Sequence, residues 1–404
     1  MYFVNNYRKL QIQKRQTTIM GNPKIYFPNL NGLRFIAAFL VIVHHIEQFK
    51  LIFNLDNYWG VLPFVGMVGK LGVFLFFVLS GFLITYLLLA EEHAFKKISI
   101  GKFYMRRIIR IWPLYFLIIM LAFFVLPNID LFTLPGYGKD EVYSDLLLKL
   151  FLYAIFFPNL VMTLTGFVPY ASHIWTIGTE EQFYFVWPLA LKYFVKYRLV
   201  LMLFIKVFYL VLVALLATEY TDFLPYKNVI SVFVSSFKID CLAIGAICAI
   251  LLFQKSKSLN VLLNNYLFYS TIIVTMYLIL KGVCFTYLHD EIYSVLFGII
   301  ILNFAANDKI KISLENRVLN YLGNISYGLY MYHSIGIVLT LAICTSMNLS
   351  TNWIIYPLCF LITITMAGLS YKYYETFFLK FKSKFSKITS GSESQTSVEG
   401  NYKE

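Results

Sequence analysis

Long apolar stretches separated by polar loops dominate the pattern of this chain. A helix that crosses about 30 Å of hydrocarbon needs about 20 mostly apolar residues. Two apolar stretches, near 146–165 and 179–196, are irregular, because Pro158 and Asn159 interrupt the first and a glutamate pair opens the second. Regular stretches of sufficient length predict transmembrane helices near residues 30–50, 68–90, 107–126, 199–217, 229–253, 266–282, 287–305, 319–344 and 352–378.

The distribution of Lys and Arg predicts the side of the membrane that each loop faces, because short cytoplasmic loops collect these residues. The N-terminal segment and the loop 96–110 are basic, whereas the loop 130–145 is acidic. This alternation continues to the basic tail only if residues 146–196 make one net crossing. We therefore predict an all-α polytopic membrane protein with about ten transmembrane helices, both termini in the cytoplasm, and one irregular or re-entrant segment between about 146 and 196.

Composition supports a membrane protein. Hydrophobic residues make up 59% and charged residues 14% of the 404 residues, whereas about a quarter of a soluble chain is charged. The net charge of +13 would favour nucleic acid in a soluble domain, but the basic loops account for it, so we expect a lipid bilayer and no nucleic acid as partner. The five cysteines have no metal-ligand spacing, and we expect neither a metal nor a bound cofactor.

The predicted organisation is one membrane domain with two polar ends. Residues 1–28 form a basic cytoplasmic segment that lacks the apolar run of a cleavable signal peptide. Residues 29–380 form the membrane domain. Residues 381–404 form a polar cytoplasmic tail, which we expect to be disordered because it is rich in Ser, Lys and Glu.

Ionisable residues inside apolar spans cost about 2.5–3.5 kcal/mol each on insertion scales and are therefore functional candidates. Arg34 and His45 lie within about 20° of one helix face and about 16 Å apart along it, so they can line one passage. The alternative is an interfacial arginine at one end of the span and interfacial histidines at the other. In the second span, Gly72, Ser80 and Gly81 allow close approach by a thin ligand or, equally, by another helix.

The loop before the third span carries paired arginines. Arg107 and Arg110 are three residues apart at a helix start, so their guanidinium groups share a face at the membrane boundary. Fork-shaped guanidinium groups suit phosphate oxygens. The alternative role is to set topology or to bind lipid phosphate.

A carboxylate pair opens the second irregular stretch. Glu180 and Glu181 follow Trp175, and a carboxylate at membrane depth is costly unless it is paired or faces water. One of them could orient a histidine base, although acidic residues are also favoured at helix N-termini. Asp240 and His333 are further, individually weak candidates.

Together these motifs resemble acyltransferase family 3, a family of integral membrane O-acyltransferases, and they follow the family's order from about Asn29 to Phe378. The chain departs from the family pattern at Lys238, where Arg often precedes the Asp, and in its closing motif, which lacks a Pro. The matching motifs are Arg34 with His45, the span from Gly72 to Gly81, Arg107 with Arg110, the run from Trp175 to Tyr184, and the run from Gly323 to His333.

The resemblance implies transfer of an acyl group, commonly acetyl, from acyl-coenzyme A to a hydroxyl of a carbohydrate, such as a cell-surface polysaccharide or lipid-linked sugar, at a bacterial-type inner membrane. His45 would act as general base, with Glu180 or Glu181 orienting it, or would form a covalent acyl-histidine. The residues implied to hold the donor are Arg34, Arg107, Arg110, Gly72, Ser80 and Gly81. Candidate pocket residues are Trp175, His333 and Asp240.

Two other classes of membrane protein compete with this interpretation. A secondary transporter or a glycan or lipid permease would also have about ten spans and buried Arg, His and Glu. The chain shows no convincing internal duplication of the kind that many transporters have. A receptor or scaffold would leave the buried charges unexplained, and the residues indicate no particular protein partner.

Overall fold

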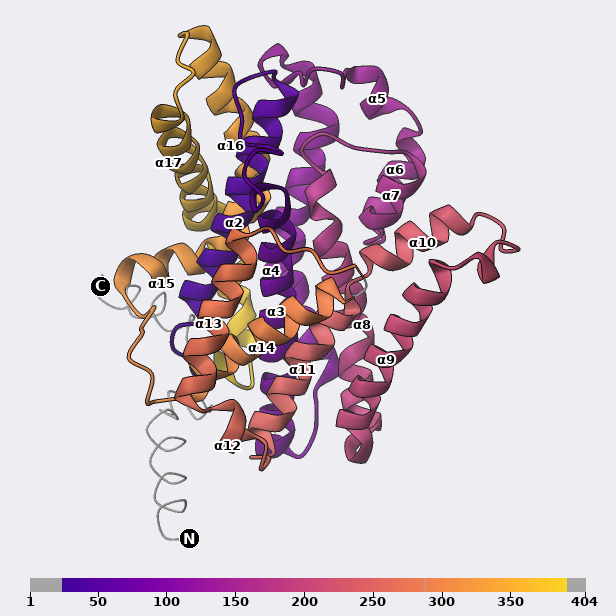
Figure 1. Cartoon of the computed structure of the whole chain (residues 1–404), viewed down its shortest axis with the longest axis vertical. Helices are drawn as coiled ribbons and strands as arrows, with labels where there is room; N and C mark the ends of the chain where they lie inside the picture. The colour runs from indigo at the N-terminus through magenta and orange to yellow at the C-terminus, as the bar shows by residue number, and fades with distance from the viewer. Residues whose placement is uncertain (1–23, 287, 391–404) are drawn as a thin grey trace.

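The computed structural model describes residues 24–286 and 288–390, which form a bundle of helices (Figure 1). Most of the predicted N-terminal segment 1–28 and tail 381–404 lies outside these residues, as do both termini. The main helices are α2 (Leu30–Ile52), α3 (Val65–Phe95), α4 (Ile100–Met120), α5 (Lys139–Tyr143), α6 (Leu146–Ala154), α7 (Pro158–Leu164), α8 (Trp175–Tyr193), α9 (Arg198–Leu216), α10 (Lys227–Ser236), α11 (Ile239–Phe253), α12 (Leu259–Leu262), α13 (Asn265–Leu280), α14 (His289–Ala306), α15 (Arg317–Asn324), α16 (Ser326–Ser346), α17 (Asn352–Ser370) and α18 (Thr376–Lys382).

Within the described residues, eight helical segments are long and apolar enough to cross a membrane. Every regular stretch predicted above overlaps one of them or the shorter apolar helix α13. The prediction of an all-α polytopic membrane protein is confirmed. The eight segments are Leu30–Ile52, Val65–Phe95, Ile100–Asn128, Val195–Leu216, Lys227–Phe253, His289–Ala306, Ser326–Ser346 and Asn352–Phe385.

The irregular segment lies in the first half of the interval 146–196. Helices α6 and α7 have 9 and 7 residues, about 14 and 11 Å at 1.5 Å per residue, so neither can cross the hydrocarbon. Between them, Phe156 has a positive φ of 62°, which interrupts the helical path. Helix α8 has 19 residues and, at about 29 Å, is the part of this interval that is long enough to span.

The predicted span 229–253 is not one continuous helix. Helix α10 ends at Ser236 and α11 begins at Ile239, and the two point in different directions (Figure 1). Lys238 lies between them with a left-handed φ of 36°, and its ammonium group pairs with Asp290 at the start of α14. Apolar periodicity did not predict this break, and the ion pair formed at it joins Lys238 to a residue far along the chain.

The ends of the described chain pack against the bundle. A short strand, β1 (Lys24–Ile25), pairs in parallel with β2 (Thr389–Ser390). Residues 383–385 form a 3₁₀ turn after α18, and the carbonyl of Phe385 accepts a hydrogen bond of 2.9 Å from Arg106. The described start of the predicted tail therefore packs against both α4 and β1.

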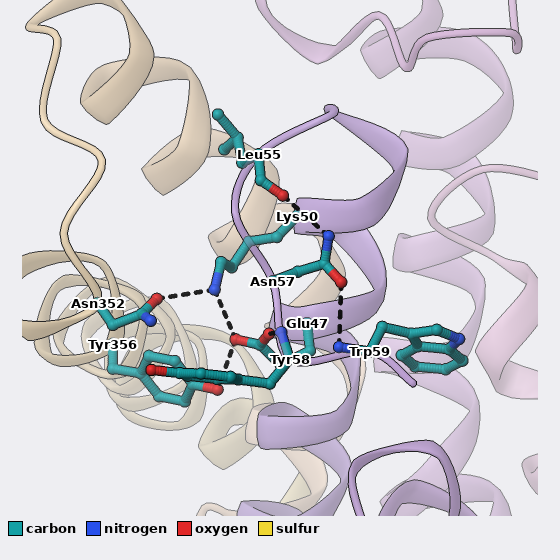
Figure 2. Close-up of polar contacts among 8 residues, drawn as sticks. All are labelled: Glu47, Lys50, Leu55, Asn57, Tyr58, Trp59, Asn352 and Tyr356. Carbon is teal, nitrogen blue, oxygen red and sulfur yellow. Dashed lines mark hydrogen bonds and ion pairs between the residues drawn. The ribbon is translucent and has the colours of Figure 1, made fainter. Parts of the chain in front are cut away.

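A buried polar network joins α2, the loop after it and α17 (Figure 2). Glu47 and Lys50 pair at 2.7 Å, and neither side chain is exposed to solvent. The Lys50 ammonium also donates to Asn352 Oδ1 at 2.7 Å, and the Tyr356 hydroxyl donates to Glu47 at 2.8 Å. The other Glu47 oxygen accepts from the backbone N–H of Tyr58. This network anchors the loop that carries Trp59 next to the end of α2.

Helices α3 and α11 approach so closely that only glycine fits at their crossing. A Cβ on Gly81 would lie 2.0 Å from the carbonyl oxygen of Leu242, and a Cβ on Gly245 would lie 2.0 Å from that of Val78. Both obstacles are backbone atoms, so no side chain can rotate away to relieve the overlap. Small residues at helix interfaces permit such close backbone contact in membranes.

We expect Gly81→Ala and Gly245→Ala to lower the thermal unfolding midpoint of the purified protein, because overpacking a close contact costs about 1–3 kcal/mol or more. Gly66→Ala is the matched control in the same helix α3, since nothing lies within 4 Å of a Cβ at Gly66. Equal midpoints for Gly81→Ala and Gly66→Ala would contradict the close packing of α3 on α11.

Candidate active site

A cavity of about 170 Å³ lies between α2, α3, α4, α8 and α16. It gathers residues from distant parts of the sequence, including three arginines predicted to hold a donor and Ser80 of α3. Four cationic side chains and one carboxylate line it within the described residues. The charged lining residues are Arg34, Arg107, Arg110, Lys382 and Glu180.

Arg107 is held in the cavity wall by aromatic rings. Its guanidinium carbon lies 5.5 Å from the ring centres of both Phe103 and Tyr184, within cation–π range. Its Nε–H is buried without a hydrogen-bond partner, and a buried donor of this kind calls for an acceptor. On the neighbouring helix, Arg34 donates to Asn31 Oδ1 at 2.9 Å, which fixes its guanidinium at the lining. The arrangement suits an anionic group inside the cavity.

The two adjacent glutamates have different surroundings, because neighbours on a helix point about 100° apart. Glu180 lines the cavity and hydrogen-bonds with Ser80 and Tyr184, whose hydroxyls are themselves 2.6 Å apart. Glu181 faces α4, where Trp112 Nε1 donates to it at 3.4 Å. Only Glu180 belongs to the cavity.

His45 lies in a cluster of three histidines beside the cavity. Its ring centre is 4.7 Å from that of His333, which is 4.6 Å from that of His173. His45 Nδ1 lies 2.8 Å from the carbonyl oxygen of Val41, one helical turn earlier. Burial and the nearby His45 lower the pKa of His173 to about 3, so the His173 ring is neutral at physiological pH.

The structure does not bring a glutamate to His45. The Val41 carbonyl occupies the ring nitrogen that Glu180 or Glu181 was expected to orient, and Glu180 contacts Ser80 and Tyr184 instead. The physical reason is that α2 itself supplies an acceptor to His45, so no carboxylate from α8 is needed.

Tyr330 separates the cavity from the histidines and contacts both. It lines the cavity, and its hydroxyl donates to the carbonyl of His173 at 2.6 Å and bonds Thr176 Oγ1 at 2.8 Å. Its own carbonyl lies 2.5 Å from His333 Nδ1. Tyr330 thus interrupts the predicted passage from Arg34 to His45: Arg34 lines the cavity, and His45 belongs to the histidine cluster beyond the tyrosine.

Several predicted site residues lie outside the cavity lining. A Cβ on Gly72 would lie 2.6 Å from the Ala37 carbonyl of α2, and Gly81 faces α11, so both glycines pack helices together. Asp240 is buried on α11, with both carboxylate oxygens unpartnered, and its charged neighbours include Lys238. Trp175 stacks edgewise on Phe77 at 6.2 Å, while the following Thr176 reaches the cavity.

Sequence reasoning missed three residues of this region. His173 opens the polar cluster that contains the run from Trp175 to Tyr184, two residues before Trp175, but it was not placed among the site residues. Tyr330 lies in the late motif that ends at His333, and nothing else in the sequence marks it as a site residue. Lys382 was placed in the tail, and no local pattern distinguishes it from the other tail lysines.

Comparison with known proteins decides the family. The family model of acyltransferase family 3, described as "Acyltransferase domain", matches residues 27–372. The chain belongs to acyltransferase family 3. The matched region contains every helix from α2 to α17, and it stops before Lys382, the last charged residue of the cavity lining in this family 3 acyltransferase.

Relatives with curated names are O-acetyltransferases. The O-acetyltransferase OatA of Staphylococcus aureus (strain NCTC 8325 / PS 47) is 25% identical over 374 residues, covering 88% of this chain and 58% of that protein. The putative peptidoglycan O-acetyltransferase YrhL of Bacillus subtilis (strain 168) is 27% identical over 367 residues, covering 87% and 54%. The peptidoglycan O-acetyltransferase OatA of Listeria monocytogenes is 29% identical over 176 residues, covering 43% and 25%.

The family 3 chain thus spans a little over half the length of the first two relatives. No solved structure matches it.

Proposed function

We propose that this chain is a membrane O-acyltransferase that moves an acetyl group from acetyl-coenzyme A to a hydroxyl of a cell-wall glycan of the peptidoglycan type. The observation that carries the proposal is the cation-lined cavity, which lies one side chain, Tyr330, away from the histidines that include His45. Family membership supports acyl transfer, and the names of the relatives support acetyl and peptidoglycan.

The lining fits a phosphorylated donor. Arg107 and Arg110 lie on one face of α4 and Arg34 comes from α2, so their guanidinium groups reach one anion from two directions. A coenzyme A molecule carries its phosphates at one end and its thioester at the other. Phosphates bound at these arginines leave the thioester free to extend toward Tyr330 and the histidines.

His45 then serves as the base. Its Nδ1 faces a carbonyl oxygen, which can only accept, so Nδ1 carries the hydrogen and Nε2 carries the lone pair. The acceptor oxygen bonds to the thioester carbon as its proton passes to Nε2, the carbon–sulfur bond breaks, and the proton leaves on the coenzyme A sulfur. The alternative is direct attack by Nε2 on the thioester carbon: a nitrogen–carbon bond forms as the carbon–sulfur bond breaks, giving an acyl-histidine. The acceptor oxygen then bonds to the acetyl carbon as the nitrogen–carbon bond breaks, and the acceptor proton leaves on the coenzyme A sulfur.

The test uses purified full-length chain in lipid nanodiscs with radiolabelled acetyl-coenzyme A and soluble peptidoglycan fragments. We expect free coenzyme A to appear with label in the glycan, and both to depend on adding the glycan. Absence of both signals over a panel of bacterial glycans would contradict the proposal. Uptake of intact glycan into proteoliposomes without coenzyme A release would identify a permease instead.

Donor binding should depend on the cavity arginines. We expect Arg107→Ala and Arg110→Ala each to weaken acetyl-coenzyme A binding about tenfold or more, because each removes a charge-assisted hydrogen bond worth about 1.5–3 kcal/mol. The measurement is a binding titration on detergent-purified protein. Unaltered affinity in both variants would assign these arginines to membrane topology.

Arg106→Ala is the matched control for these variants. Arg106 lies on the same turn of α4 but is absent from the cavity lining, and it pairs with Glu91 at 3.1 Å. Its removal should leave donor affinity unchanged in the folded fraction. A loss equal to that of Arg107→Ala would show that general helix charge, and not the cavity, attracts the donor.

A further inference from the structure

Two of the three clustered histidines have no role in the mechanism above. His333 is completely buried on α16, and His173 is 9% exposed in the 3₁₀ turn before α8. His45 of α2 is partly exposed. The ring centres follow one another at 4.7 and 4.6 Å, in the order His45, His333, His173. Three elements that are distant in the sequence thus contribute to one row of imidazole rings, which begins at His45, the proposed base.

Backbone contacts fix the tautomer of His333. The Nδ1 of His333 lies 2.5 Å from the Tyr330 carbonyl oxygen, so Nδ1 carries the hydrogen and Nε2 carries a lone pair. His173 is hydrogen-bonded to the backbone of Met331. The Nε2 atoms of both residues are buried without any partner.

An unpartnered buried acceptor is costly, about 1–3 kcal/mol, and is rare in native proteins. Two of them side by side indicate that a hydrogen-bond donor enters the cluster at some stage. In the described ranges, no group of three or more His, Cys, Asp or Glu is arranged to hold a metal ion.

Protonation of His45 creates such a donor. While His45 is neutral, its Nε2 and that of His333 are both acceptors and cannot bond to each other. When Nε2 of His45 takes a proton, it becomes an N–H donor beside the His333 ring, whose Nε2 carries a lone pair. The interaction therefore exists only in the charged state, which is the kind of contact that accelerates a reaction.

We propose that His333 and His173 are positioning residues that stabilise protonated His45 during acyl transfer. This inference rests on the proposed function. As the acceptor O–H bond breaks and the new oxygen–carbon bond forms, the proton moves to His45 Nε2 and is shared with His333 Nε2. His173 packs edge-on against the His333 ring at 4.6 Å and holds it in the row by this contact. The carbon–sulfur bond then breaks, and the proton passes to the sulfur of the departing coenzyme A.

The decisive variant is His333→Asn. The Asn side-chain N–H can still donate to the Tyr330 carbonyl, so the local fold is preserved, but no basic nitrogen remains. We expect kcat to fall about tenfold or more, with KM and affinity for acetyl-coenzyme A unchanged within about twofold. His173→Asn should lower kcat in the same way but by less, since its ring is one step further from His45.

His44→Asn is the matched control. The His44 ring is also close to His45, at 5.0 Å, but its Nδ1 bonds the Val65 carbonyl at 2.8 Å and it packs on Trp59 outside the row. We expect its kcat to match that of the unmodified protein.

A second variant tests the row if His333→Asn fails to fold. His333→Ala leaves a space the size of an imidazole, and added imidazole should restore part of its turnover. Folded His333→Asn with full kcat, or folded, donor-binding His333→Ala that imidazole does not restore, would overturn the inference while the proposed function stands. An unmodified protein that transfers no acetyl group would instead overturn the proposed function itself.

Discussion

Replacing His45 by alanine is expected to abolish acetyl transfer while leaving the amount of folded protein in membranes unchanged. Loss of a general base alone lowers rates about 10²–10⁴-fold, and an acyl-histidine route would be lost completely. The side chain bonds only to Val41 of its own helix, so its removal breaks no hydrogen bond between helices. The measurement is label transferred from acetyl-coenzyme A per folded molecule, with abundance followed by quantitative immunoblot.

His44→Ala gives the contrasting result for an adjacent histidine. Its ring bonds the Val65 carbonyl of α3 and packs on Trp59, so we expect lower thermal stability with turnover per folded molecule retained. Replacing His44 should thus lower thermal stability but not turnover, whereas replacing His45 should lower turnover but not the amount of folded protein. Activity that survives His45→Ala would remove His45 from the mechanism, whatever His44→Ala does.

The sequence predicted which residues share a helix face but not which helix lies opposite that face. Arg34 was recognised because charges inside apolar spans are rare, and Arg107 and Arg110 because their spacing places them on one helix face; all three meet at one cavity. Gly72 and Gly81 were assigned to the donor because small residues allow a thin ligand, or equally another helix, to approach closely. They instead contact backbone of α2 and α11, which spacing along α3 cannot reveal.

The same limit explains what was missed at the histidine cluster. His333 and His173 approach each other across about 160 residues of sequence and are joined through Tyr330, so no local motif shows the row. The ion pair formed at the break at Lys238 likewise joins it to a distant partner in α14. Hydropathy predicts the place of the apolar spans because that signal is carried by each segment alone.

Removing one partner of the buried pair between Glu47 and Lys50 should destabilise the fold strongly. Glu47→Leu leaves the Lys50 ammonium completely buried with Asn352 as its remaining hydrogen-bond acceptor in the network. It also removes the acceptor of the Tyr356 hydroxyl. Breaking a buried ion pair in this way costs about 3–5 kcal/mol. We expect a large fall in the thermal unfolding midpoint and in the yield of monodisperse protein.

The double variant Glu47→Leu with Lys50→Met should recover part of this loss, because an apolar pair carries no unpaired charge. The control is Lys227→Ala, which breaks a pair of 2.5 Å with Asp222 and a hydrogen bond to the Thr218 carbonyl; the side chains of Lys227 and Asp222 are 20% and 66% exposed. Exposed pairs contribute about 0–1 kcal/mol, so this variant should unfold almost as the unmodified protein does. If Glu47→Leu were no less stable than Lys227→Ala, the network would not anchor the loop to α17. The loop carrying Trp59 would then be held against His44 by apolar packing alone.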